Sequence, residues 1–267
     1  MIDPATALEL SPPEAAELAQ LRYVSDQQPG WRRRRCGRGF SYLNQAGERL
    51  GQAQTARLRA LAIPPAWTEV WICPWPNGHI QAVGRDARGR KQYLYHPRWQ
   101  QLSDETKFSR ILAFGEQLPE LRARIEHDLG RRGVSRERIL AAVVRLLETT
   151  LIRIGNREYA RRDQSFGLTT LRDDHLDVRG STLRFQFRGK SGKEHEVTLA
   201  DRRLARLVKQ CQELPGQELF QYLGDDGAYH ALESVDVNAY LREVTGSPFT
   251  AKDFRTWGGT VAAASQL

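Results

Sequence analysis

The sequence predicts an α+β protein, with a small β-rich N-terminal domain and a larger, mainly α-helical domain that carries a three-stranded β insert. Short strand-like runs among Trp, Pro and Gly occupy roughly the first hundred positions. An apolar repeat of helical period follows, and a segment of period two interrupts the helices. We therefore expect one domain at residues 1–103 and a second at residues 104–267.

The N-terminal domain is expected to consist of short antiparallel strands. Gly39–Leu43 alternates apolar and small residues and precedes the turn-like segment Asn44–Gly47, a pattern that is typical of a hairpin. Residues 67–75 and 79–83 flank a turn rich in proline and glycine, and residues 91–96 are a further strand candidate. We interpret these runs as one small β domain.

The C-terminal domain begins where the spacing becomes helical. Ser103 and Ser135 are candidate N-caps, and the helix after Ser135 repeats apolar side chains at i, i+3 and i+4. Residues 177–199 then alternate apolar and polar side chains between glycine-containing turns, which predicts three strands. Further helices are expected at residues 201–214, at 234–244 and from 250 to the end.

The composition is that of a globular chain with excess positive charge. Of the 267 residues, 40% are hydrophobic and 27% are charged, and 40 basic against 32 acidic residues leave a net charge of +8. A basic surface attracts polyanions, so nucleic acid is the first partner to consider. No apolar run approaches the ~20 residues of a membrane helix, and no secretory signal is visible, so no membrane association is expected.

Cysteine and histidine spacing argues against disulfides and metal sites. Cys36, Cys73 and Cys211 are an odd number, lie far apart and form no CxxC pair. The six histidines show neither HxxxH nor HExxH spacing. We expect no metal, no cofactor and a reducing, cytoplasmic compartment.

Several segments hold cations in patterns that merit a functional interpretation. Arg32–Arg35 is first interpreted as a solvated or flexible charge run, and second as a phosphate-contacting loop. Residues 84–99 interleave cations with aromatics, which favours a solvated β-hairpin and leaves DNA contact as the alternative. Gly189–Ser191 is similar to the end of a P-loop, but Arg184 stands where that motif needs Gly, and strands flank the segment, so nucleotide binding is excluded.

Two arginines stand out because apolar residues surround them. Arg153 follows the helix after Ser135 and has isoleucine on both sides, and Arg255 has the same character. Such an arginine either forms a buried ion pair or is positioned to bind an anion. Together with Lys190 on a predicted β-turn, the two arginines could bind phosphate oxygens with an acid nearby. Spacing alone does not bring the three residues together.

In their order along the chain, these segments resemble the type IB DNA topoisomerases in their short, poxvirus-like and bacterial form. The resemblance covers nearly the whole chain from about Arg35 onward. It rests on four motifs: the GRKQYxY core of Gly84–Tyr95, Leu151–Gly155, Phe187–Lys190 and Lys252–Thr256. Tyrosine recombinases, which belong to the same superfamily, usually carry His where Lys252 stands, so the topoisomerase branch is favoured.

The resemblance implies a C-shaped clamp of two domains that closes around double-stranded DNA. It implies that Arg153 and Arg255 bind the non-bridging oxygens of the scissile phosphate. It also implies that Lys190 is the general acid that protonates the leaving 5′ oxygen. Lys252 is assigned an auxiliary part in this proton transfer. The expected DNA-binding residues are Lys91, Gln92, Tyr93, Tyr95 and Tyr159.

The resemblance also implies the reaction. A monomeric, nucleoid-associated enzyme would nick one strand through a 3′-phosphotyrosyl linkage, let the duplex swivel and reseal it without ATP or a metal ion. The family's nucleophilic Tyr lies several tens of residues after the second arginine, with a His or Asn between them. This chain ends twelve residues after Arg255, without a Tyr or His there. We therefore expect a chain that lacks the nucleophile-bearing segment and binds DNA without cleaving it.

The sequence leaves two alternative functions open. The alternatives are a tyrosine recombinase or integrase, which shares the cationic clamp, and a non-catalytic DNA-binding protein with an eroded clamp. Tyr222, Tyr229 and Tyr240 precede Arg255, so none matches the nucleophile by order. They are expected to be surface or core residues.

Overall fold

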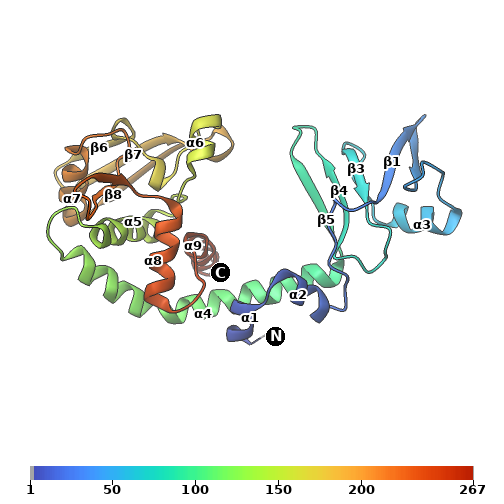
Figure 1. Cartoon of the computed structure of the whole chain (residues 1–267), viewed down its shortest axis with the longest axis horizontal. Helices are drawn as coiled ribbons and strands as arrows, with labels where there is room; N and C mark the ends of the chain where they lie inside the picture. The colour runs from blue at the N-terminus through green and yellow to red at the C-terminus, as the bar shows by residue number, and fades with distance from the viewer. Residues whose placement is uncertain (1–2, 267) are drawn as a thin grey trace. The chain divides into compact units, whose positions relative to one another are not determined.

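Figure 1 shows the structure, a computed structural model in which residues 3–266 are described. The chain divides into two compact units between Ser109 and Arg110. The first unit holds an antiparallel sheet, and the second holds helices and a three-stranded sheet. The predicted α+β class is confirmed.

The first unit is built around a five-stranded antiparallel sheet of order β2-β1-β3-β4-β5. The strands are β1 (Trp31–Cys36), β2 (Gly39–Leu43), β3 (Thr68–Ile72), β4 (Ile80–Arg85) and β5 (Lys91–Tyr95). The helices of this unit are α1 (Pro4–Glu9), α2 (Pro12–Leu18) and α3 (Gln52–Ala60). One face of the sheet packs against Leu58 of α3, and the other packs against Val24 of the segment before β1.

The arginine run is a strand, so its interpretations as a flexible segment or a loop are wrong, although Arg32, Arg34 and Arg35 are exposed to solvent as the first interpretation expects. Arg32–Arg35 forms most of β1, and the alternation of the strand turns Arg33 toward the loop after α3. The Arg33 guanidinium donates hydrogen bonds of 3.0, 2.9 and 2.7 Å to three backbone carbonyls of that loop. The acceptors are Ile63, Pro64 and Trp67. Burial lowers the pKa of Arg33 from its ordinary value.

A long helix, α4 (Pro97–Leu129), begins earlier than predicted, and Ser103 lies inside it instead of capping it. Proline is pre-organised for the first helical position. The His96 ring accepts a hydrogen bond of 3.1 Å from the backbone N–H of Arg98, which satisfies one of the free donors at the helix start. The expected domain boundary between residues 103 and 104 falls inside this helix.

The second unit is mainly helical. Its remaining α-helices are α5 (Arg136–Thr150), α6 (Arg157–Asp163), α7 (Arg202–Gln212), α8 (Ser234–Thr245) and α9 (Ala251–Ala264). The predicted three-stranded sheet is present as β6 (Leu176–Arg179), β7 (Thr182–Arg188) and β8 (Glu194–Ala200). A short hairpin of β9 (Gln221–Leu223) and β10 (Tyr229–Ala231) was not predicted.

Helix α5 is the hydrophobic centre of the second unit. Ser135 caps it as predicted, since its side chain accepts a hydrogen bond from the backbone N–H of Arg138. The apolar side chains of the helix are 0–1% exposed. Burial of each large one is worth about 1.5–3 kcal/mol. These residues are Ile139, Leu140, Ala141, Ala142, Val143, Val144, Leu146 and Leu147.

A buried carboxylate joins α4 to α8. Asp128 is 0% exposed, and it accepts hydrogen bonds from Arg124 at 2.8 Å, Arg131 at 3.1 Å and the Tyr240 hydroxyl at 2.9 Å. Burial alone would raise the pKa of Asp128, but these hydrogen bonds outweigh it and hold the pKa below its ordinary value. Tyr240 is thus a core residue, as expected.

Helix α9 is held against the end of α5 by a close contact. Leu151, the C-cap of α5, has a left-handed backbone with φ 55°, which is uncommon outside glycine. Its carbonyl accepts a hydrogen bond from the Arg255 guanidinium. Its side chain lies beside Gly258, where a Cβ would approach Leu151 Cδ2 to 2.6 Å, whereas a Cβ on Gly259 would meet nothing within 4 Å.

Replacement of the buried carboxylate should destabilise the chain in a pH-dependent way. We expect Asp128→Asn to lower the free energy of unfolding at pH 7 by about 2–4 kcal/mol, because the charge-assisted hydrogen bonds are lost. A lowered folded-state pKa contributes stability above the ordinary carboxyl pKa of about 4, and this contribution is lost as the pH falls through the folded value. The difference from the unchanged chain should therefore shrink at pH 3 in urea unfolding.

The control for this change is Asp177→Asn, which removes an exposed ion pair with Arg179 at 2.8 Å. Such surface pairs are worth about 0.5 kcal/mol. If the two variants unfold at the same urea concentration, the structural role assigned to Asp128 is incorrect.

Two adjacent glycines of α9 should respond oppositely to alanine. Gly259→Ala is expected to stabilise the helix by up to about 1 kcal/mol, because alanine is the better helix former. Gly258→Ala should destabilise the chain by about 1–3 kcal/mol, because its Cβ overlaps Leu151. Thermal unfolding measures both changes. The Leu151→Ala background should relieve the penalty at position 258, and equal stabilisation by both alanines would refute the close contact.

Candidate active site

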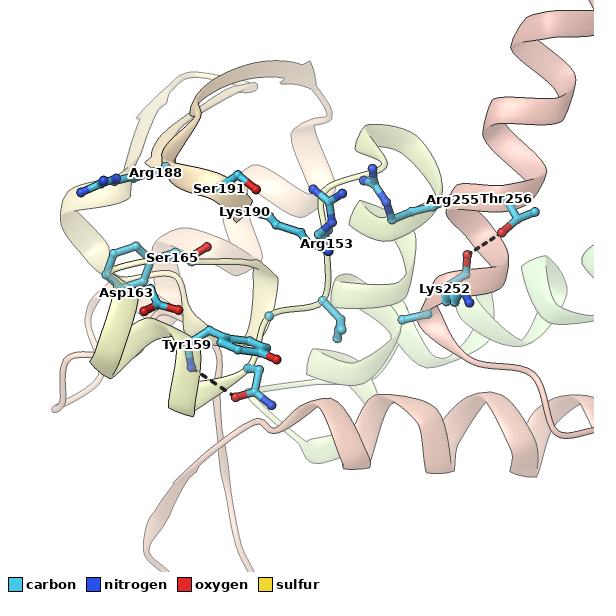
Figure 2. A pocket seen from close by; sticks show the side chains of 16 residues that line it. Arg153, Tyr159, Asp163, Ser165, Arg188, Lys190, Ser191, Lys252, Arg255 and Thr256 are labelled. Carbon is cyan, nitrogen blue, oxygen red and sulfur yellow. Dashed lines mark hydrogen bonds between the residues drawn. The ribbon is translucent and has the colours of Figure 1, made fainter. Parts of the chain in front are cut away.

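A pocket of the second unit is lined by the four residues that were predicted as catalytic. Arg153, Lys190, Lys252 and Arg255 line this pocket together with Tyr159 (Figure 2). They come from the segment after α5, the turn between β7 and β8, the helix α9 and the helix α6. The fold thus brings together residues that sequence spacing alone could not place near one another.

Arg153 is presented by an extended segment whose backbone is fixed. Its carbonyl accepts a hydrogen bond of 2.9 Å from the N–H of Leu168, and the N–H of Thr169 donates one of 2.7 Å to Ile154. The two segments approach so closely that a Cβ on Gly167 would lie 2.5 Å from the Arg153 carbonyl oxygen. The Arg153 side chain is exposed and has no acidic partner within residues 3–266. It is therefore not part of a buried ion pair.

Arg255 is positioned by the first turn of α9. The Asp253 carboxylate accepts hydrogen bonds from the N–H and hydroxyl of Thr250, which caps the helix, and it pairs with Arg110 at 2.7 Å. The Arg255 guanidinium is half-buried and donates to the Leu151 carbonyl. Burial, and after it the positive charge of Arg153, lower the pKa of Arg255 from its ordinary value. Two guanidinium groups therefore face the same pocket and repel each other.

Lys190 projects from a tight turn between β7 and β8. The Gly189 N–H donates to the Lys193 carbonyl at 2.7 Å, and the Gly192 N–H donates to the Gly189 carbonyl at 3.1 Å. A Cβ on Gly189 would lie 2.5 Å from the ring of His195, so the turn packs directly on that ring. Only the three-residue 3₁₀ turn Lys190–Gly192 begins here. The exclusion of a P-loop agrees with this geometry.

The pocket carries excess positive charge. Its cationic lining residues are Arg153, Arg188, Lys190, Lys252 and Arg255. The acidic side chain among the lining residues is Asp163, which accepts a hydrogen bond of 3.0 Å from Arg162. That hydrogen bond lowers the pKa of Asp163. The excess charge suits an anion with several oxygens, such as a phosphodiester.

Some lining residues were not singled out by the sequence analysis. Asn156 caps α6 and accepts hydrogen bonds from the N–H groups of Glu158 and Tyr159, at 2.8 and 3.4 Å. Arg188 and Thr256 also line the pocket. Each of the three lies within three residues of a predicted site residue, and this closeness is the signal that could have identified them.

The other predicted DNA-binding residues lie on β5, at the edge of the sheet in the first unit. Lys91 forms an ion pair with Asp26 at 2.6 Å, and the Gln92 amide donates to Asp86 at 3.0 Å. Tyr93 is 41% exposed and stacks on Tyr95 with ring centroids 5.9 Å apart. Edge strand β5 thus presents amide and aromatic groups, and DNA contact by them stays a prediction.

Residues 3–266 hold neither a metal-binding cluster nor a membrane-spanning helix. No group of three or more His, Cys, Asp and Glu side chains there could hold a metal ion. No helix in that range is long and apolar enough to cross a membrane. The three cysteines are free, and Cys36 is exposed whereas Cys73 and Cys211 are buried.

Two protein-family descriptions match the chain. Residues 96–267 match "Eukaryotic DNA topoisomerase I, catalytic core". This match includes every residue of the cationic pocket. Residues 39–86 match "Bacterial DNA topoisomerase IB, N-terminal domain", which covers β2, β3 and β4 of the first unit.

Curated viral proteins are similar over most of this chain. DNA topoisomerase 1B of Acanthamoeba polyphaga mimivirus is 34% identical over 209 residues, which cover 77% of this chain and 62% of the relative. DNA topoisomerase 1B of vaccinia virus (strain Copenhagen) and DNA topoisomerase I of monkeypox virus are each 24% identical, over 75% of this chain and 62% of theirs. This chain spans 62% of the length of these relatives. With the catalytic-core description matched over more than half of its residues, the chain belongs to the type IB DNA topoisomerase family.

Proposed function

We propose that the cationic pocket binds one phosphodiester of duplex DNA, and that the natural protein relaxes supercoiled DNA by transient cleavage of one strand. The observation that carries this proposal is the convergence of Arg153, Lys190 and Arg255 on one pocket whose acidic lining residue, Asp163, pairs with Arg162 and not with any of the three. Family membership supports double-stranded DNA as the partner.

In the proposed reaction, the two arginines stabilise charge that develops on the phosphate. A tyrosine hydroxyl loses its proton to water as its oxygen forms a bond to phosphorus, and the bond from phosphorus to the 5′ oxygen breaks. Arg153 and Arg255 bind the non-bridging oxygens, where fixed guanidinium groups act without reorganisation. Lys190 gives its proton to the departing 5′ oxygen, and Lys252 supports this transfer. The 3′-phosphotyrosyl ester keeps the bond energy, so resealing needs no ATP.

The described tyrosines of the second unit do not supply an obvious nucleophile. Tyr240 is buried against Asp128, and Tyr222 and Tyr229 are not among the lining residues of the pocket. Tyr159 lines the pocket from α6 and is 51% exposed. We assign Tyr159 to DNA contact by resemblance, and we propose that residues 1–267 alone bind DNA without forming a covalent adduct.

The natural full-length protein should relax supercoiled plasmid in EDTA without ATP. Arg153→Ala and Lys190→Ala should each lower the relaxation rate by about 100-fold or more, because each removes a group that acts on the developing charge. Agarose gels of single-turnover time courses measure the rates. The control is Lys193→Ala, since Lys193 lies in the same turn, is exposed and does not line the pocket.

A substrate with sulfur in place of the bridging 5′ oxygen separates the two roles. A thiolate leaves without a proton, so this substrate should restore cleavage by Lys190→Ala but not by Arg153→Ala. Absence of relaxation by the unchanged full-length protein would contradict the proposed function. A non-catalytic DNA-binding protein would bind the plasmid and relax it in no variant.

The nucleophile proposal is tested on the 267-residue chain. Incubation with labelled duplex, followed by denaturing gels, should give no covalent protein–DNA band although the duplex is bound. A covalent band would overturn the proposal. Its loss in Tyr159→Phe would then identify Tyr159 as the nucleophile, because this change removes one hydroxyl and leaves the ring in place.

A further inference from the structure

The net positive charge is concentrated in one hairpin of the first unit. Residues 27–47 contain five arginines and no acidic residue, and they carry five of the eight net positive charges of the chain. This segment includes β1, β2 and the two-residue turn between them. Cys36 at the end of β1 pairs with Gly39 at the start of β2. An uneven distribution of this kind marks a surface that attracts polyanions.

The five arginines have two different roles in the structure. Arg33 is committed to the fold, since its guanidinium binds three carbonyls of the loop after α3. The other four are exposed, and none has an ion-pair or hydrogen-bond partner for its side chain within residues 3–266. These four are Arg32, Arg34, Arg35 and Arg38.

In the hairpin formed by β4 and β5, by contrast, most cationic side chains have acidic partners. Arg85 pairs with Glu69 at 2.9 Å, Arg90 pairs with Asp86 at 2.7 Å, and Lys91 pairs with Asp26 at 2.6 Å. The cations of β4 and β5 are thus largely neutralised by nearby acids. The exposed cations of β1 and its turn are not, so they remain available to an anionic partner.

The strand register places Arg32 and Arg34 on the face that carries Tyr93, whereas Arg35 shares the opposite face with Arg33. Arg32 pairs with Trp71, Trp71 pairs with Val83, and Val83 pairs with Tyr93. Paired residues share a face, and three strand spacings separate Arg32 from Tyr93 by roughly 14 Å. The centre of this row is covered, since the Trp71 indole donates to the Gln28 carbonyl at 2.9 Å. A ligand can therefore contact this face on both sides of the covered centre.

This separation matches the dimensions of duplex DNA. The major groove is about 12 Å wide, so the phosphate strands that flank a groove over β5 lie within that distance of it, in the range that long arginine side chains on β1 can reach. Arg34 lies two residues further along β1 than Arg32, on the same face. A long arginine side chain binds phosphate oxygens in a bidentate manner and needs no particular base.

We propose that the β1–β2 hairpin is a second DNA-backbone contact of the first unit, in which Arg32, Arg34 and the turn residue Arg38 bind phosphates. This inference rests on the proposed function, because it takes duplex DNA as the ligand. The hairpin supplies affinity that is independent of sequence and strongly dependent on salt. Arg33 in the same run serves the fold and contributes no phosphate contact.

The first test uses Cys36, the exposed cysteine of β1, as a native reporter. Alkylation by N-ethylmaleimide in native buffer should label Cys36 and spare the buried Cys73 and Cys211. Saturating duplex DNA should slow this labelling by about tenfold, because a bound duplex blocks access to the thiol. Salt that releases the DNA should restore the rate. Labelling at an unchanged rate while fluorescence anisotropy reports a fully bound duplex would overturn the proposal.

The second test compares charge removal at two places. The hairpin variant is Arg32→Gln/Arg34→Gln/Arg38→Gln, and the control is Arg202→Gln/Arg206→Gln/Lys209→Gln, which removes three exposed cations of α7. Each lost phosphate contact lowers the slope of log K against log salt by about 0.9. We expect a decrease of about 2–3 in the hairpin variant and less than about 1 in the control. Replacement by Lys at the same three hairpin positions should retain the slope.

The possible results distinguish a failure of the hairpin contact from a failure of the proposed function. A duplex bound by the unchanged chain and by the hairpin variant with equal slopes would overturn the hairpin contact and leave the proposed function intact. Failure of the unchanged chain to bind any duplex would overturn both. Circular dichroism checks that the hairpin variant, which keeps Arg33, retains its fold.

Discussion

The pocket depends on the junction at Leu151, where the end of α5 meets α9. The left-handed backbone of Leu151 turns its carbonyl to the Arg255 guanidinium, and Gly258 leaves room for its side chain. Two residues later the chain presents Arg153, whose carbonyl is bound by Leu168. One junction therefore sets the positions of both arginines, which neither helix could determine alone.

The structure distinguishes arginines that serve the fold from those that remain available. Arg33 binds loop carbonyls, Arg110 pairs with Asp253, and Arg124 pairs with the buried Asp128. Arg153 has no such partner within residues 3–266, and burial, followed by the charge of Arg153, lowers the pKa of Arg255. The fold holds these like charges together at a cost in free energy, which a bound phosphate would offset.

Much of the fold and of the site could be predicted from the sequence, for physical reasons that differ between elements. The period-two stretch at 177–199 and the cap at Ser135 are local signals, and both predictions are confirmed. The start of α4 was missed because Pro97 and the His96 ring begin the helix earlier than Ser103. The ordered state of Arg32–Arg35 was missed because it depends on carbonyls about thirty residues away, at Ile63 and Pro64. Five lining residues, among them Arg153, Lys190 and Arg255, were predicted by resemblance, whereas their convergence needed the fold.

The central claim is that unpaired cations of the second unit converge on one phosphodiester. A crystal structure of the chain with duplex DNA tests it most directly. The account predicts one phosphate with its non-bridging oxygens about 3 Å from the guanidinium groups of Arg153 and Arg255, and with Lys190 facing its 5′ oxygen. A complex in which the duplex is bound while the cationic pocket contacts no phosphate would contradict it.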